Sequence, residues 1–201
     1  MAEIALFGGT FNPIHNGHVQ MIKALCQQKE VDRVLVMPAF LPPHKQADHL
    51  VGAADRLKMC EIACCPFEKA RVSDLEIQKG GKSYTVETVQ LLKKRYPGHH
   101  FFVCMGADMT VTLDTWYRYD LLKTLCGFYS FSRCGVASED YHRKVEELRR
   151  GGADIRVIDT PIRAVSSTEV RQRILAGQNP EPLVPVGVAE YIASHLLYQN
   201  R

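Results

Sequence analysis

Short apolar runs rich in Val, Ile and Phe alternate along this chain with longer segments that have the apolar spacing of amphipathic helices. This alternation is typical of β-α units and predicts a parallel sheet covered by helices. The predicted strands cover residues 2–7, 33–38, 70–75, 100–105, 126–132 and 154–158. The predicted helices cover residues 17–28, 52–64, 84–96, 116–125 and 139–150. We therefore expect an α/β fold with a doubly wound parallel sheet.

The chain after the last predicted strand has a different pattern. A short predicted helix follows Val165-Ser166-Ser167-Thr168, a proline-rich stretch covers 179–185, and a final amphipathic helix covers 186–198. No repeat, low-complexity segment or linker divides the sequence. We expect one Rossmann-like domain over residues 1–201 with a small C-terminal helical portion at about 166–201. Ligands of such sheets bind beyond the carboxyl ends of the strands, so the first β-α loop is a candidate site.

Composition and charge narrow the class of protein. The 201 residues are 46% hydrophobic and 23% charged, which is typical of a globular domain. The net charge of +3 is too small to indicate a nucleic-acid partner. No apolar run approaches the roughly 20 residues that span a bilayer, and the first residues do not resemble a signal peptide. We expect no membrane partner, a cytoplasmic location, and seven reduced cysteines packed as small hydrophobic side chains.

The loop after the first predicted strand carries unusual chemistry. It reads GGTFNPIHNGH over residues 8–18, and a simple turn has no need of two imidazoles. Gly8 and Gly9 allow a ligand to approach the backbone closely, and the first helix begins near Gly17. Its free N–H groups favour an anion, so His15 and His18 are aimed at a phosphate site. Two solvent-facing histidines, or a zinc pair, are the alternatives; no thiolate or carboxylate with useful ligand spacing lies nearby.

Two other nucleotide-binding motifs do not fit. Lys79-Gly80-Gly81-Lys82-Ser83 resembles the tail of a P-loop, but Glu76 stands where the first glycine of that motif belongs. The dinucleotide fingerprint GxGxxG is absent after the first strand, so a bound NAD cofactor is not implied.

The opening loop resembles the (T/H)xGH signature of the nucleotidyltransferase superfamily, and the whole chain is similar to the bacterial nicotinate-nucleotide adenylyltransferase family. Further matching segments follow in order: Pro42-Pro43-His44-Lys45, Ser83-Tyr84-Thr85, Gly106-Ala107-Asp108, Thr115-Trp116-Tyr117, Val165 to Arg171, and Leu183-Val184-Pro185. Two positions depart from the pattern, since many members have Asp in place of Asn12 and Pro in place of Lys82. The first departure removes a charge near the phosphate region, so no residue is assigned as a metal ligand.

The resemblance implies transfer of the adenylyl group of ATP to nicotinate mononucleotide. It implies His15, His18 and Arg171 as catalytic residues. The implied ATP-binding residues are Gly8, Gly9, Thr10, Phe11, His15, His18, Gly106, Asp108, Ser166, Ser167, Thr168 and Arg171. The implied nicotinate mononucleotide-binding residues are His44, Lys45, Ser83, Tyr84, Thr85, Asp108 and Trp116. Mg²⁺ is expected to arrive with ATP, and a homo-oligomer is compatible with the sequence.

Several of these residues also have structural interpretations. Ser166 and Glu169 have the spacing of a capping box, which is compatible with the implied phosphate site at the same helix start. Asp108 follows a strand and either caps the next helix or, by resemblance, holds ribose hydroxyls or orients the substrate. Trp116, the single tryptophan, either packs in the core or stacks on the pyridine ring. Ser83-Tyr84-Thr85 would offer helix-start N–H groups to the nicotinate carboxylate.

The implied reaction needs no general base. A phosphate monoester has its second pKa near about 6, so the attacking phosphate is already largely a dianion at neutral pH. The protein must position the reactants in line and neutralise charge on the phosphoryl oxygens. His15 and His18 would donate hydrogen bonds to those oxygens, with Arg171 and Lys45 as cationic clamps.

Two other functions fit less well. A phosphopantetheine adenylyltransferase or a cytidylyltransferase would share the superfamily, but the former is usually shorter and commonly has Lys at the place of Arg171. The latter commonly has Arg-Thr-x-Gly-Ile-Ser-Thr-Thr, which Arg163 to Thr168 does not match. A non-catalytic nucleotide sensor would typically have lost one of the paired histidines or the distal arginine, and all three are present.

Overall fold

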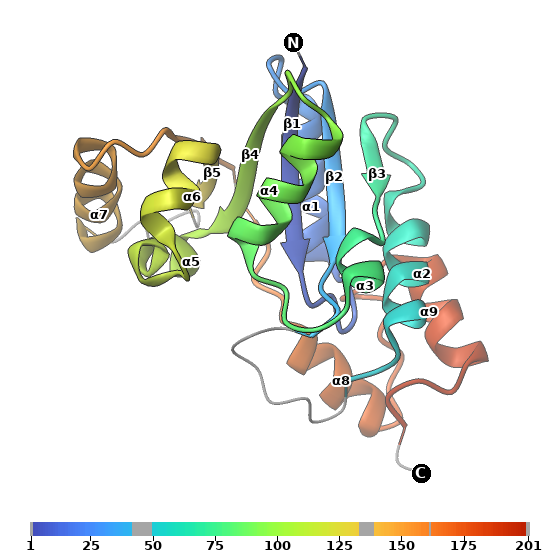
Figure 1. The fold of residues 1–201 in the computed structure, drawn as a ribbon. Coiled ribbons are helices and arrows are strands. Elements are labelled where there is room, and N and C mark those ends of the chain that lie inside the picture. The colour runs from blue at the N-terminus through green and yellow to red at the C-terminus, as the bar shows by residue number, and fades with distance from the viewer. Residues whose placement is uncertain (1, 42–49, 133–138, 161, 200–201) are drawn as a thin grey trace.

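Six parallel strands form one sheet in the computed structural model, which describes residues 2–41, 50–132, 139–160 and 162–199 (Figure 1). The strands are β1 Glu3–Gly9, β2 Arg33–Pro38, β3 Ala70–Val72, β4 His100–Gly106, β5 Gly127–Ser132 and β6 Ile155–Asp159. Their order across the sheet is β3-β2-β1-β4-β5-β6. The predicted doubly wound α/β fold is confirmed.

The strand order reverses between β1 and β4. The first strand lies in the middle of the sheet, where Leu6 is in register with Leu35 of β2 and with Val103 of β4. The chain builds outward to β3, crosses over, and then builds outward from β4 to β6. The crevice beyond the carboxyl ends of β1 and β4 is therefore the topological switch point at which ligands of such folds bind.

Helices cover both faces of the sheet and enclose two cores. On one face α1 (Asn16–Gln27), α2 (Ala53–Cys64) and α9 (Val186–Ser194) bury residues such as Phe7, Val36 and Phe131. On the other face α4 (Thr85–Arg95), α6 (Tyr119–Leu125) and α7 (Glu139–Arg150) bury residues such as Leu6 and Phe128. Alternate strand residues thus enter opposite cores, as a buried parallel sheet requires.

Local structure differs from the sequence prediction in four places. The short helices α3 (Leu75–Lys79) and α5 (Ala107–Val111) were not predicted. The strand predicted over 70–75 ends at Val72, because α3 begins at Leu75. The helix predicted over 116–125 starts later, because Arg118 is left-handed and a separate 3₁₀ turn, η1, covers Leu113–Thr115. The last helix ends at Ser194, and left-handed Leu196 and Tyr198 turn the chain back.

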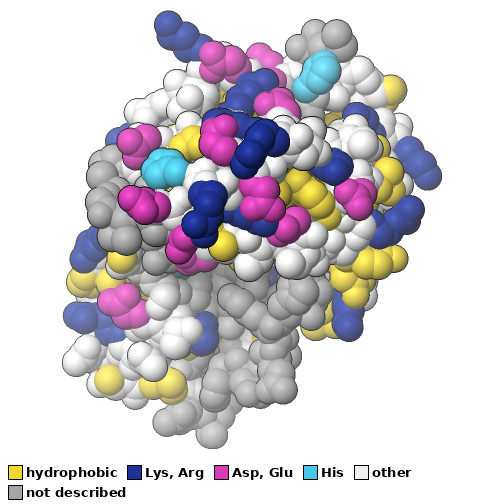
Figure 2. Space-filling view, turned by 90° about the vertical axis from the view of Figure 1, so that its left-hand side faces the viewer, with side chains coloured by type: hydrophobic (Ala, Val, Ile, Leu, Met, Phe, Trp, Pro, Cys, Tyr) yellow, Lys and Arg dark blue, Asp and Glu magenta, His cyan; other side chains and the backbone are white. Residues whose placement is uncertain are grey.

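The side surface over α7 carries a mixture of acidic and basic residues in place of a single-sign patch (Figure 2). Among the described residues, no helix is both long and apolar enough to cross a membrane. The six described cysteines are free thiols, and four of them are buried. Burial raises the pKa of the Cys64 and Cys126 thiols to about 12, so both remain protonated at neutral pH.

Candidate active site

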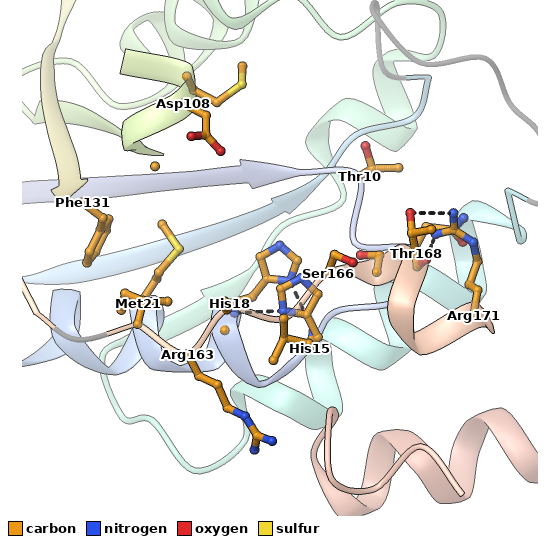
Figure 3. A pocket seen from close by; sticks show the side chains of 18 of the residues that line it. Thr10, His15, His18, Met21, Asp108, Phe131, Arg163, Ser166, Thr168 and Arg171 are labelled. Carbon is orange, nitrogen blue, oxygen red and sulfur yellow. Dashed lines mark hydrogen bonds between the residues drawn. The ribbon is translucent and has the colours of Figure 1, made fainter. Parts of the chain in front are cut away.

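A cavity of about 560 Å³ lies at the switch point of the sheet, between the N-termini of α1 and α8 (Ser167–Leu175) (Figure 3). It brings together residues from the first loop, the end of β4 and the C-terminal portion. The sequence-predicted residues that line it are Thr10, His15, His18, Gly106, Asp108, Ser166, Ser167, Thr168 and Arg171. Two helix N-termini at one cavity make a site that favours an anion.

The two histidines form a reciprocal cap at the start of α1. His15 is the N-cap residue, and its Nδ1 accepts a hydrogen bond from the amide of His18 at 3.4 Å. The Nδ1 of His18 accepts one from the amide of His15 at 3.2 Å. The two rings stack with their centroids 3.6 Å apart. Because each Nδ1 is an acceptor, each neutral ring carries its hydrogen on Nε2.

Burial decides the charge of the His15 ring. The side chain is 7% exposed, and this burial lowers its pKa to about 4. His15 is therefore neutral at physiological pH and acts on an anion as a hydrogen-bond donor, without a full positive charge. The sequence predicted two imidazole donors near a phosphate, and the hydrogen bonds to Nδ1 identify Nε2–H as the donor of both rings.

The start of α8 is bonded to the first loop. Ser166 caps the helix by accepting a hydrogen bond from the amide of Glu169 at 3.1 Å, as its capping-box spacing predicted. Ser167 Oγ donates to the carbonyl of Pro13 at 2.9 Å. Arg171 donates from Nη1 to the carbonyl of Asn12 at 2.9 Å and from Nη2 to Thr168 Oγ1 at 3.3 Å. The two halves of the phosphate-facing wall are therefore held in fixed relation.

Three predicted ATP-binding residues do not line this cavity. Phe11 is 2% exposed and packs edge-on against His18, with ring centroids 5.0 Å apart. A Cβ atom on Gly9 would lie 2.8 Å from the Phe11 ring, so this position requires glycine for close packing. Gly8 precedes it at the end of β1. The close packing of Phe11 against Gly9 and His18 thus supports the loop.

Of the residues expected to bind the pyridine nucleotide, Asp108 lines the cavity described above, whereas Ser83, Tyr84 and Thr85 lie at the start of α4. Tyr84 is the N-cap residue of α4, and its ring lies 4.7 Å from the ring of Tyr117. Half-buried Trp116 packs against the same core, and Ser83 Oγ accepts a hydrogen bond from the amide of Phe40 at 3.3 Å. Apart from Asp108, these residues do not line the cavity between α1 and α8. His44 and Lys45 lie outside the described residues.

Sequence reasoning missed part of the cavity wall. An apolar side is formed by Met21, Phe131, Ile162 and Val165, and Arg163 adds a cation whose Nη1 donates to the carbonyl of Pro182 at 3.1 Å. Met21 follows His18 by one helical turn, and Phe131 lies at the carboxyl end of β5. Both positions could have been found from helix periodicity and from the rule that strand ends face the ligand.

A switch-point cavity lined by two helix starts, paired imidazole donors and an arginine is suited to hold the phosphates of a nucleotide. The cytidylyltransferase-like family model matches residues 6–173. The chain belongs to this family and, within it, to the nicotinate-nucleotide adenylyltransferases, as its relatives show.

The relatives match over their whole length. The chain is 38% identical to the probable nicotinate-nucleotide adenylyltransferase of Exiguobacterium sibiricum, covering 98% of both chains. It is 36% identical to the probable enzyme of Neisseria meningitidis serogroup B, covering 100% of both. The fold is shared with Plasmodium falciparum nicotinic acid mononucleotide adenylyltransferase complexed with NaAD, at a TM-score of 0.81, 18% identity and 98% coverage of each chain.

Proposed function

We propose that this protein transfers the adenylyl group of ATP to nicotinate mononucleotide, giving nicotinate adenine dinucleotide and pyrophosphate in NAD biosynthesis. One observation carries the proposal: the paired histidines at the start of α1 and Arg171 of α8 line the same cavity. Family membership supports the choice of substrates, because the relatives are named for this reaction. Two solved structures of the Plasmodium falciparum enzyme, which has the same fold, are named as complexes with NaAD and with APC.

The triphosphate of ATP fits between the two helix starts. His15 and His18 would donate from Nε2 to phosphoryl oxygens, while Ser167, Thr168 and Arg171 hold the β- and γ-phosphates. The apolar wall around Met21 and Phe131 suits the adenine ring. Mg²⁺ enters as part of the substrate and supplies further charge neutralisation on the phosphates.

The reaction is a substitution at the α-phosphorus. A phosphate oxygen of nicotinate mononucleotide forms the new P–O bond while the bond to the β-phosphate oxygen breaks and pyrophosphate leaves with that electron pair. No proton has to be removed from the dianionic nucleophile. The neutral Nε2–H groups would donate to the oxygens on which negative charge increases in the transition state. Donors that already point at those oxygens lower the activation barrier without having to reorient.

The nicotinate group would be recognised outside the phosphate cavity. Within the part of the chain that the structure describes, the amides of Thr85 and Val86 at the start of α4 donate to no backbone carbonyl, so they can donate to a carboxylate, with the Thr85 hydroxyl beside them. Trp116, Tyr84 and Tyr117 offer aromatic faces to the pyridine ring. Asp108 lines the cavity opposite the histidines (Figure 3) and would meet the ribose hydroxyls.

The test is a pyrophosphate-release assay with one nucleotide donor and one acceptor at a time. ATP should be combined with nicotinate mononucleotide, nicotinamide mononucleotide or phosphopantetheine, and CTP with phosphocholine. We expect turnover with ATP and nicotinate mononucleotide, and loss of at least about 10²-fold in His18→Ala, which removes a transition-state donor. Faster turnover with phosphopantetheine or with CTP would overturn the assignment. The cytoplasmic location and any homo-oligomer stay predictions.

A further inference from the structure

Arg56 is a buried arginine whose partners are all backbone carbonyls. It lies in the first turn of α2, and its side chain is 1% exposed. Nη1 donates to the carbonyls of Thr10 at 2.8 Å and Ala39 at 2.6 Å. Nη2 donates to the carbonyl of Phe40 at 3.1 Å, and Nε donates to that of Val51 at 3.3 Å. Four of its five N–H groups are thereby used on three separate chain segments.

Burying the Arg56 guanidinium costs free energy of folding, so the residue must provide something that an apolar side chain at this position could not. Burial lowers the pKa of Arg56, and within the part of the chain that the structure describes no carboxylate pairs with its guanidinium. A buried cation without a counter-ion persists only where its hydrogen bonds are satisfied. The planar guanidinium provides several donors in a fixed fork, which lysine cannot reproduce. The three segments are consequently held at one fixed spacing.

Two of these segments lead to the two halves of the proposed site. Thr10 lines the phosphate cavity directly. On the other side, the peptide between Ala39 and Phe40 has its carbonyl on Arg56 and its N–H on Ser83 Oγ, the residue before the N-cap of α4. The opposite orientation of C=O and N–H in one rigid peptide plane makes this a direct link. The amide of Ser83 adds a second bond, to the carbonyl of Leu41 at 3.2 Å.

We propose that Arg56 is a positioning residue that sets the spacing between the Thr10 loop and the start of α4, and so couples the binding of the two substrates. The inference rests on the proposed function, because that function places ATP at the first element and the nicotinate group at the second. In-line transfer needs the attacking oxygen within about 3–3.5 Å of the α-phosphorus, and a misplacement of about 1 Å can cost on the order of 10²-fold in rate.

The test compares Arg56→Lys with the matched control Arg149→Lys. Arg149 in α7 donates to one backbone carbonyl with Nε and Nη2, that of Ile155 at 3.0 and 2.8 Å, pairs through Nη1 with Glu146 Oε1 at 2.7 Å, and does not line the cavity. The measured quantity is the coupling factor: the Kd of α,β-methylene-ATP alone divided by its Kd in saturating nicotinate mononucleotide. Calorimetry gives both values, and thermal melts fix a temperature at which each variant is folded.

We expect wild type to show a coupling factor above about 5, in the usual range for linked sites. Arg56→Lys should bring the factor toward one and lower kcat about 10²-fold at saturating substrates, while Arg149→Lys keeps both. Should Arg56→Lys not fold, Ser83→Ala is the second variant, because it leaves Arg56 and its carbonyls in place and removes the side-chain half of the link to α4, the bond from the Phe40 amide to Ser83 Oγ, while the bond between the Ser83 amide and the Leu41 carbonyl remains. That variant should lower the coupling factor with little change in melting temperature.

The outcomes separate the inference from the function on which it rests. A wild-type chain that releases no pyrophosphate with nicotinate mononucleotide would overturn the proposed function. An active wild type with a coupling factor of one, or a folded Arg56→Lys that keeps kcat and coupling within about 2-fold, would leave the function standing and reduce Arg56 to a stabilising role. Arg56 is likewise reduced to a stabilising role if Arg149→Lys loses coupling as strongly as Arg56→Lys.

Discussion

His15 combines two functions that proteins usually assign to different residues. Helix N-caps are most often Ser, Thr, Asp or Asn, because a small side chain can accept a hydrogen bond from the first turn. His15 makes that bond with Nδ1 and keeps Nε2–H for a ligand. The cap requires the neutral ring, and the low pKa of about 4 keeps the ring neutral. The same residue therefore links the stability of the fold to the protonation of the site.

We expect the free energy of unfolding to fall as pH is lowered from about 6.5 to about 4. The unfolded chain binds a proton at His15 near the ordinary histidine pKa of 6.5, whereas the folded chain does so only at about 4. Stability from this residue is thus complete above 6.5, and about 3 kcal/mol is lost by pH 4. Urea unfolding at several pH values measures it. His15→Asn, which keeps a capping side chain, should show a shallower fall, and identical slopes would contradict the prediction.

The hydrogen bonds of Arg171 lead to a second prediction. Its guanidinium already bonds to the Asn12 carbonyl and to Thr168 Oγ1, so under the proposed function it would meet the phosphates in a fixed orientation. Arg171→Ala should weaken ATP binding strongly, and Arg171→Lys less, because lysine keeps the charge and loses the fork. Calorimetric titration with an ATP analogue distinguishes them. Unchanged ATP affinity with lowered stability would show that Arg171 only ties α8 to the loop.

Among the elements, we propose that the start of α4 determines which pyridine nucleotide is used. Backbone N–H groups donate and cannot accept, so a carboxylate fits there and the amide nitrogen of nicotinamide would face donor with donor. We expect nicotinate mononucleotide to be preferred over nicotinamide mononucleotide by at least about 10²-fold in kcat/KM. Trp116→Ala should weaken both substrates and preserve most of that ratio, since stacking does not detect the carboxylate. Comparable kcat/KM values in wild type would contradict this site.

Regular elements could be predicted from the sequence because their signals are local. Alternating apolar runs indicated the six strands, and Ser166 with Glu169 indicated the start of α8. The short helices α3 and α5 offer too few residues for a periodic pattern. Arg56 has the sequence signal of an ordinary surface arginine in a predicted helix, because its burial depends on the carbonyls of Thr10, Ala39 and Phe40, which are distant from it in the sequence. The reciprocal histidine bonds likewise depend on ring orientation, which residue spacing does not specify.

The C-terminal residues of the described chain contact the first loop, although the two segments lie far apart in the sequence. Tyr198 is 8% exposed, and its hydroxyl donates to Asn12 Oδ1 at 2.9 Å. The same Oδ1 accepts a hydrogen bond from the amide of Val51 at 3.3 Å, which gives Asn12 a structural role in the loop. The loop is thereby bonded both to the segment that precedes α2 and to the C-terminal residues.

Removing that hydroxyl should affect both stability and ATP. Tyr198→Phe is expected to cost about 1 kcal/mol in the free energy of unfolding, the usual worth of one hydrogen bond, and to raise the KM for ATP. Tyr191→Phe is the matched control, because its hydroxyl bonds to Asp55 Oδ1 at 3.0 Å and does not touch the first loop. Urea unfolding and initial rates measure the two effects. Equal KM values in the two variants would contradict a link from the tail to the site.

The bond between Tyr198 and Asn12 also has a consequence for synthesis on the ribosome. Asn12 is made early, and the central strand before it can begin to pair as soon as its neighbours emerge. Tyr198 is translated later than every other residue that touches the loop through a described hydrogen bond. A nascent chain can therefore assemble its sheet while its ATP loop still lacks this partner. Truncated translation products would carry a nearly complete fold with an unfinished catalytic loop.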